Sequence, residues 1–212
     1  MAPNRRPVLG YIQEAIVTQR LKQTIFWSFV VVCIAGAAFI LAWKLWTGRP
    51  AGTPKPLPKL KSPRIVIEKR RRRLTVFDGQ TPVKNYRIGL GWGKGNKLKE
   101  GDGCTPEGEF YICHHNPQSR YRLSLGLSYP NEEDAARGLR EGLISRQEHD
   151  SIVNAIEHKK TPPWNTKLGG EIMIHGNGAD RDWTGGCVAM EDADIEELYK
   201  ALPDGTAVEI LP

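Results

Sequence analysis

An uncharged stretch near the amino end restricts what this chain can fold into more than any other feature. Residues 25–43, IFWSFVVVCIAGAAFILAW, contain no Asp, Glu, Lys or Arg over 19 positions. A helix rises about 1.5 Å per residue, so this stretch would span about 30 Å, the thickness of the hydrocarbon core of a bilayer. Tryptophans suit the membrane interface, and here they are Trp27, Trp43 and Trp46. The pattern predicts an uncleaved transmembrane anchor over residues 25–47.

A buried core helix and a cleaved signal peptide are the alternatives. Ala35-Gly-Ala37 is a small-residue sequence of the kind that signal peptidases cut. Against cleavage, 24 residues precede the apolar stretch, and residues 39–43 stay apolar where a cleavage region turns polar. An anchor is therefore favoured, preceded by a tail over residues 1–24. Basic residues flank both ends of the anchor, so their distribution does not determine its orientation.

The positive charge is confined to the membrane-proximal part. Residues 1–63 hold nine basic residues and one acidic residue, which leaves a charge of −2 for residues 64–212. Nucleic-acid binding requires a basic face on the folded domain, so the sequence predicts no nucleic-acid partner. The local basic run Lys69–Arg73 is interpreted as a solvated turn or a contact to an anionic polymer. Residues 48–63 hold five prolines and are expected to form an extended linker.

The remaining sequence has strand-like patterns before and after one helical segment. Apolar and polar residues alternate between residues 64 and 89, which predicts an antiparallel meander. Residues 132–160 instead have helical periodicity, and Ser145 with Glu148 forms a capping-box sequence. Further strands are expected at Phe110–Cys113, Gly170–Ile174 and Ala207–Leu211, and a helix at Glu191–Leu202. The predicted fold class is mainly β with a helical insert (α+β).

Two short segments carry the residues most suited to catalysis. Met173-Ile-His-Gly176 supplies His175, and Trp183-Thr-Gly-Gly-Cys-Val188 supplies Cys187. A cysteine attacks carbonyl groups as its thiolate, so it requires a nearby base and a lowered pKa, and His175 is the candidate base. The glycines before Cys187 allow backbone N–H groups to approach an oxyanion. The alternatives are a buried small side chain for the cysteine and a structural role for the histidine.

The spacing of these residues resembles the signature of the L,D-transpeptidase catalytic-domain (YkuD-like) family, in which His-Gly, a short insert and Ser/Thr-x-Gly-Cys follow one another. The matching residues are His175, Gly176, Thr184, Gly186 and Cys187. The segment Thr105-Pro-x-Gly108-x-Phe110 resembles the same family and lies about 70 residues upstream. The resemblance implies a YkuD-like β-sandwich or barrel catalytic domain over residues 64–212, behind a single transmembrane helix.

An irregular stretch over residues 116–131 resembles the cleft-side loop of one subgroup of this family. An ordinary surface loop is the alternative. The predicted cleft residues are Ser124, Tyr129, Asn131 and Trp183. The helical insert is expected to form a flap or wall over the site.

The resemblance implies a cysteine acyltransferase that acts on peptidoglycan stem peptides without a metal or cofactor. Cys187 would attack a peptide carbonyl, His175 would accept the thiol proton, and the N–H groups of Gly186 and Cys187 would hold the oxyanion. Thr184 belongs to the same signature, and the Gly176 carbonyl is expected to orient the imidazole. Because such a substrate lies outside the inner membrane, we expect the tail in the cytoplasm and the domain in the periplasm.

Two positions depart from the usual family pattern. Many members carry a His where this chain has Gly185, and an Arg or Asn where it has Ala189. These departures leave hydrolysis as an alternative to transfer. The run Gly186-Cys-Val-Ala-Met190 is similar to one in the subgroup that includes peptidoglycan-protein amidases, which makes a wall-attached lipoprotein a candidate partner. The remaining alternative is a non-catalytic module that tethers the wall.

Overall fold

The computed structural model describes Trp27, Gly36 and residues 56–212. Apart from Trp27 and Gly36, the predicted tail and anchor lie outside the described residues, as does the first half of the linker. None of the helices in this described part is long and apolar enough to cross a membrane. The predictions for residues 1–47 therefore remain predictions.

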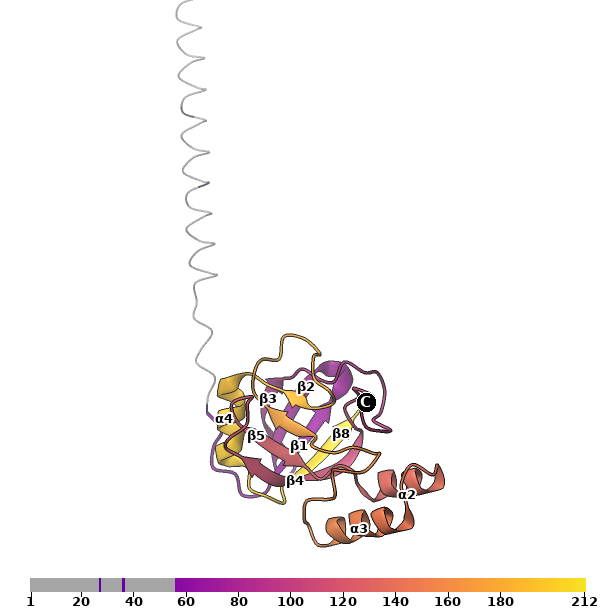
Figure 1. Ribbon diagram of the computed structural model, residues 1–212. Coiled ribbons are helices and arrows are strands. Elements are labelled where there is room, and N and C mark those ends of the chain that lie inside the picture. Colours follow the sequence, from indigo (N-terminus) through magenta and orange to yellow (C-terminus); the bar gives the residue numbers. More distant parts are fainter. Residues whose placement is uncertain (1–26, 28–35, 37–55) are drawn as a thin grey trace, which may run out of the picture. The chain divides into compact units, whose positions relative to one another are not determined.

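Eight strands form one mixed sheet in the order β3-β2-β1-β8-β4-β5-β6-β7 (Figure 1). The strands are β1 (Pro63–Glu68), β2 (Arg73–Asp78), β3 (Thr81–Arg87), β4 (Gly108–Asn116), β5 (Ser124–Leu127), β6 (Met173–His175), β7 (Val188–Ala189) and β8 (Ala207–Leu211). The first three strands pair antiparallel in chain order, which confirms the predicted meander. The final strand β8 enters the middle of the sheet, parallel to β1 and antiparallel to β4.

A contact between distant segments brings the two ends of this sheet together. Gly89, just after β3, donates its N–H to the Ala189 carbonyl (2.9 Å) and accepts the Ala189 N–H (2.8 Å). Only glycine fits here, because a Cβ on Gly89 would lie 2.3 Å from the carbonyl oxygen of Arg181. The sheet therefore curls into a half-barrel, and the segment after β3 supports β7, the strand that follows Cys187.

Apolar residues on one face of the sheet and on α4 (Asp192–Ala201) form the main core. Ile195 and Leu198 of α4 are fully buried in the same cluster as Ile67 of β1, Leu125 of β5 and Ile174 of β6. Burial of each such side chain contributes about 1.5–3 kcal/mol to folding. The core thus fixes β6, the strand that ends in His175, between a helix and the rest of the sheet.

The helical insert consists of α2 (Glu132–Arg140) and α3 (Arg146–Glu157), which lie apart from α4 in Figure 1. The predicted capping box is confirmed: Ser145 Oγ accepts the Glu148 N–H (3.2 Å) and Glu148 accepts the Ser145 N–H (2.7 Å). A small apolar cluster that includes Ile152 and Leu168 packs inside the insert. The insert therefore has its own minor core.

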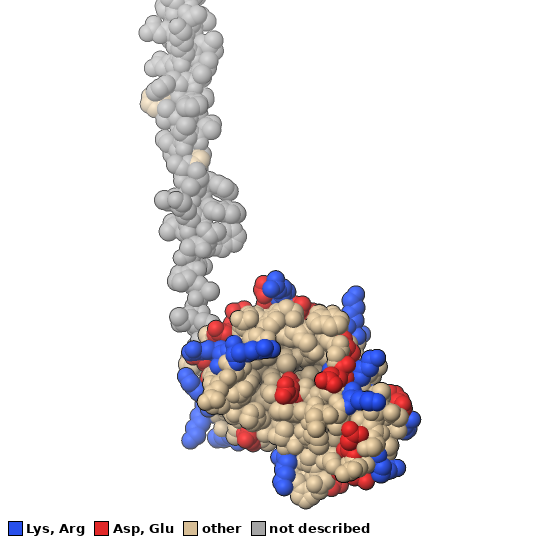
Figure 2. Space-filling model, in the orientation of Figure 1, with Lys and Arg blue, Asp and Glu red and all other residues tan. Residues whose placement is uncertain are grey.

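The basic run Lys69–Arg73 forms the turn between β1 and β2, and Arg70, Arg71 and Arg72 are exposed there, which confirms the predicted solvated turn. Lys69 begins a short 3-10 helix (Lys69–Arg71), and its Nζ binds Glu107 (2.8 Å) and the Thr105 carbonyl (2.7 Å). Arg72 forms an ion pair with Asp182 in the loop before Cys187. Figure 2 shows acidic and basic side chains interspersed on the visible face of the domain. Two side chains of the basic run therefore hold loops in place.

Candidate active site

Parallel pairing of β6 with β7 brings the candidate histidine and cysteine together. Ile174 is the register partner of Val188, and His175 is the partner of Ala189. Cys187 comes one residue before β7 and so lies beside Met173. Side chains two residues apart on a strand point to the same face, so Cys187 and His175 share one face of the sheet.

One hydrogen bond fixes the tautomer of His175. Its Nδ1 lies 2.8 Å from the Gly176 carbonyl oxygen, which can only accept, so Nδ1 carries the proton. The side chain is buried, and burial lowers its pKa, although the Gly176 carbonyl acts in the opposite direction. His175 is therefore neutral near pH 7. Its Nε2 has no hydrogen-bond partner within the described residues and is free to accept a proton.

Two aromatic side chains hold the imidazole of His175 in place. Tyr121 stacks on it, with ring centroids 4.6 Å apart and planes at 24°, and Trp183 meets it edge-on at 5.5 Å. The Tyr121 carbonyl also accepts the Gly176 N–H (3.0 Å), and Trp183 Nε1 donates to the Gly178 carbonyl (3.2 Å). Tyr121 and Trp183 also contact each other, with ring centroids 5.5 Å apart, so the two side chains form one aromatic cluster with the imidazole and restrict its rotation.

The Cys187 thiol is half-buried and surrounded by backbone groups. Sγ accepts the Met173 N–H (3.4 Å) and donates to the Glu171 carbonyl (3.5 Å). Burial raises the pKa of this thiol, while the Met173 N–H and the Lys97 ammonium act to lower it. The sequence analysis required a lowered pKa, and the structure instead shows a neutral thiol beside a neutral imidazole. No hydrogen bond joins Sγ to His175 in the described part of the chain, so the proton transfer requires rotation of the thiol.

Thr184 organises the backbone around Cys187. Its Oγ1 donates to the Cys187 carbonyl (2.7 Å) and accepts the Gly186 N–H (3.2 Å). The Gly186 N–H is thus engaged, which corrects its expected role as an oxyanion donor. The Cys187 N–H has no partner among residues 56–212 and is the available donor. Gly186 itself must be glycine, with φ 137° and no room for a Cβ beside the Cys104 carbonyl (2.8 Å).

The predicted cleft residues fall into two groups. Ser124 is buried opposite His175 in the β5–β6 pairing, and Trp183 contacts the imidazole. Tyr129 is fully buried, with its hydroxyl donating to the Leu168 carbonyl (3.1 Å), and its predicted place in an open cleft was wrong. Asn131 is the N-cap of α2 and accepts the Asp134 N–H (3.0 Å), so its role there is structural.

A cavity of about 310 Å³ lies beside the thiol. Its lining includes Gly185, two residues before Cys187, and Glu171, whose carbonyl contacts the thiol. Lys97 and Trp164 line the same cavity. Glu171 has a φ of 52°, a strained conformation for a non-glycine residue and one that occurs preferentially at functional sites.

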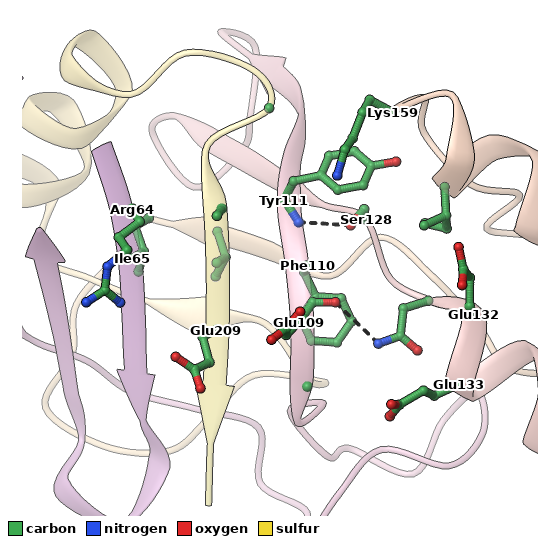
Figure 3. Close-up of a pocket in the computed structure, with 16 residues that line it drawn as sticks. Arg64, Ile65, Glu109, Phe110, Tyr111, Ser128, Glu132, Glu133, Lys159 and Glu209 are labelled. Carbon is green, nitrogen blue, oxygen red and sulfur yellow. Dashed lines mark hydrogen bonds between the residues drawn. The ribbon is translucent and has the colours of Figure 1, made fainter. Parts of the chain in front are cut away.

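A larger groove of about 600 Å³ lies elsewhere, between β1, β8, β4 and the helical insert (Figure 3). Its charged lining residues are Glu109, Glu132, Glu133, Glu209, Arg64 and Lys159. Neither His175 nor Cys187 lines it. Neither residue lines the smaller cavity either, but Glu171, which does line it, contacts Sγ of Cys187 through its carbonyl, so the smaller cavity is the one next to the thiol.

Tyr121 and Lys97 are the site residues that the sequence analysis missed. Tyr121 lies in an irregular loop, and its contact with His175 depends on the pairing of β5 with β6, for which no local sequence signal exists. Lys97 lies in a turn-rich region in which a lysine normally faces solvent. Asp182, which is close to His175 in the sequence, pairs with Arg72 and accepts the Leu90 N–H (3.0 Å).

Comparison with known proteins gives one family and a set of distant structures. The family model of the L,D-transpeptidase catalytic domain (YkuD) matches residues 62–210. No curated protein matches the sequence. Among solved structures, the helical cell shape determining protein Pgp2 from Campylobacter jejuni is 22% identical, with a TM-score of 0.49 over 79% of this chain and 54% of that chain. Bd1075 from Bdellovibrio bacteriovorus is 20% identical, with a TM-score of 0.46 over 74% of this chain and 52% of that chain. The chain thus spans about half the length of these two structures.

Proposed function

Because the chain belongs to the L,D-transpeptidase catalytic domain family, we propose that residues 64–212 form a cysteine acyltransferase that acts on peptidoglycan stem peptides. The observation that supports this most directly is the state of His175. Its Nδ1 proton is held by the Gly176 carbonyl, its Nε2 is free, and Cys187 lies on the same face of the sheet. A neutral imidazole with a free nitrogen is what a general base requires, and rotation of the thiol toward Nε2 would complete the arrangement.

In the first half of the reaction, Sγ of Cys187 attacks the carbonyl carbon of an L-residue in the stem peptide. The thiol proton passes to Nε2 of His175, and the Cys187 N–H stabilises the oxyanion. The C–N bond to the following D-residue then breaks, and His175 returns the proton to the departing amine. A thioester remains on Cys187. In the second half, an amine attacks this thioester, loses a proton to His175 and regenerates the thiol.

Hydrolysis is the second candidate, and the two departures from the family pattern favour it. Gly185 is exposed, with open space where a side chain would project, so water can reach the cavity beside the thioester. Ala189 is fully buried in β7, so no long side chain extends from that position toward an acceptor. In this reading water is the acceptor and the enzyme releases peptides or a lipoprotein from the wall.

The location of the domain follows from the substrate. We place residues 25–47 in the inner membrane as a single anchor, residues 1–24 in the cytoplasm and the catalytic domain in the periplasm. The proline-rich linker would hold the domain off the membrane surface, where stem peptides are accessible. This placement is supported by the uncharged stretch of 19 residues and by the family's action on peptidoglycan.

The proposal is tested with the full chain in detergent micelles, beside Cys187→Ala and Cys113→Ala as a matched control. Each is incubated with disaccharide-tetrapeptide, a free D-amino acid and wall carrying an attached peptide, and the products are identified by mass spectrometry. Cross-linked dimers or D-amino-acid exchange, lost only in Cys187→Ala, would support transfer. Release of the attached peptide without either product would support hydrolysis. A folded protein that turns over none of these substrates would favour a non-catalytic tethering module.

A further inference from the structure

A lysine is buried in the wall of the cavity beside the thiol. Only 3% of Lys97 is exposed. Lysine is among the residues least often buried, because removal of its ammonium from water is unfavourable unless partners replace the water. The position of Lys97 therefore requires an explanation from the groups that surround it.

The ammonium of Lys97 has fewer partners in the chain than it can bind. Nζ donates to the Lys99 carbonyl (3.0 Å) and to Asp102 Oδ1 (3.1 Å). An ammonium carries three N–H donors, so one of them has no oxygen acceptor among the described residues, although Nζ also lies 5.8 Å from the centroid of the Tyr129 ring. Asp102 stays ionised: burial alone would raise its pKa, but the hydrogen bonds it accepts, first from the Lys99 and Leu98 N–H groups, lower it.

A second donor without an acceptor lines the same cavity. The indole Nε1 of Trp164 is buried and has no hydrogen-bond partner in the described structure. Trp164 packs tightly on Gly170, where a Cβ would lie 2.3 Å from its side chain, so the indole is held in position. Buried donors without acceptors are rare in folded proteins and often belong to binding sites. Both donors belong to residues that line one cavity.

The cavity adjoins the reacting atom. Gly185 and Glu171 line it, and the Glu171 carbonyl contacts Sγ of Cys187. Glu171 and Glu100 also contribute carboxylates to the lining, but both residues are exposed and their charges are screened by water. The buried positive charge of Lys97 is screened much less. The cavity wall thus carries one buried cation, Lys97, which is paired with Asp102 and lies close to Cys187.

From these contacts we propose that Lys97 and the Trp164 N–H bind a carboxylate of the donor stem peptide and thereby select the donor. The inference rests on the proposed function, because it takes the occupant of the cavity to be the peptide that acylates Cys187. The carboxylate has two sources. It belongs either to the side chain of the residue whose carbonyl is attacked or to the free end of the D-residue that leaves.

A binding experiment separates these sources without requiring turnover. The full chain in detergent carries Cys187→Ala, and its Kd is measured by calorimetry for a tetrapeptide with both carboxylates free and for two versions, each amidated at one of them. Loss of one charge-assisted contact should weaken binding by at least about tenfold. Amidation at the carboxylate that Lys97 binds should show this loss, and amidation at the other should not.

Lys97→Met keeps the length of the side chain but removes its charge. This variant should lose the preference for the free carboxylate, and it should bind the peptide amidated at that carboxylate with the same Kd as the protein that retains Lys97. Lys97→Arg should retain the preference, and Trp164→Phe should reduce it in part. Thermal unfolding of each variant identifies a general loss of structure. Equal binding of all three peptides by the Lys97 protein overturns the proposal, and so does an equal loss for free and amidated peptides in a folded Lys97→Met.

Failure of the proposed function gives a different result. If the protein with Cys187 intact turns over no peptide while the Cys187→Ala form still prefers the carboxylate, the carboxylate site stands and the catalytic assignment does not. If turnover is present but free and amidated donors bind and react equally, the catalytic assignment stands and the carboxylate site does not.

Discussion

At the scale of single residues, the reactivity of Cys187 depends on two neutral groups. Burial raises the pKa of the thiol and lowers the pKa of His175, so both shifts disfavour a thiolate–imidazolium pair. The base must therefore act during attack. The hydrogen bond to the Gly176 carbonyl and the stacking of Tyr121 serve this step, because they leave Nε2 unprotonated and correctly oriented.

The pH dependence of alkylation tests this neutral pair. The thiolate of Cys187 forms only as pH rises through a pKa above the ordinary value of about 8.5. The rate of reaction with iodoacetamide, followed by peptide mass spectrometry, should therefore increase steadily from pH 5 to beyond about 8.5. A pH-independent rate at Cys187 between about pH 5 and 7 would instead establish an ion pair.

The pH dependence of the peptide reaction should differ from that of alkylation, because the peptide reaction depends on neutral His175 and not on a thiolate formed in advance. His175 acts as a base only when neutral, and its pKa lies below the ordinary value of about 6.5. The kcat/KM of the peptide reaction should hold constant through neutral pH and decline only below about pH 6.5. A decline that begins above pH 7 would contradict the lowered pKa of His175.

Thr184 offers a substitution that separates its hydroxyl from its volume. Thr184→Val keeps the shape but removes both hydrogen bonds of Oγ1, leaving the buried Gly186 N–H without an acceptor. The free energy of unfolding should fall by about 1–3 kcal/mol, and kcat should fall because the backbone at Cys187 loosens. Thr184→Ser, the matched control, should retain most of both. If thermal unfolding and kinetics show the same stability and kcat for Thr184→Val and Thr184→Ser, the Thr184 hydroxyl supports neither stability nor catalysis.

At the scale of secondary-structure elements, the helical insert depends on local capping and a small core. Ser145→Ala removes the side chain that accepts the Glu148 N–H, and it should lower the free energy of unfolding by about 1 kcal/mol. Hydrogen exchange should accelerate first in α3. Ser151→Ala is the control, because Ser151 is exposed and bonds only the Gln147 carbonyl one turn earlier. A loss in Ser151→Ala as large as that in Ser145→Ala would contradict the capping role.

Elements with a clear local sequence pattern, such as alternating apolar residues or a capping box, were predictable from the sequence. The β1–β3 meander, the Ser145 cap and the strand at Ala207–Leu211 all appear where periodicity and turn residues place them. Positions that depend on distant contacts were not predictable in this way. Tyr129 was assigned to a cleft because residues 116–131 resemble a cleft-side loop of the family, but the folded chain buries it in the core. Asn131 caps α2 together with Asp134 and also lines the larger groove, away from Cys187.

At the scale of the whole molecule, the closure of the sheet supports the site. Gly89→Ala would place a Cβ 2.3 Å from the Arg181 carbonyl and push the loop before Cys187 away from β7. We expect the free energy of unfolding to fall by about 1–3 kcal/mol, measured by denaturant titration. Gly185→Ala meets no atom within 4 Å and should change stability by less than about 0.5 kcal/mol. Similar losses in both variants would mean that the contact at Gly89 is not what holds the loop.

The proposed anchor determines where the active site can work. If residues 25–47 span the membrane with the tail inside, the full chain should remain in the membrane fraction after carbonate washing, and protease added to spheroplasts should digest the catalytic domain. The matched control lacks residues 1–47 and should be soluble.

Protection of the domain in intact spheroplasts would place it in the cytoplasm, away from the wall. Release of the full chain by carbonate would show that the uncharged stretch does not span the bilayer, because a span of 19 apolar residues resists extraction. The same fractions contain the mature amino terminus, and its sequence decides between an intact anchor and cleavage after Ala37.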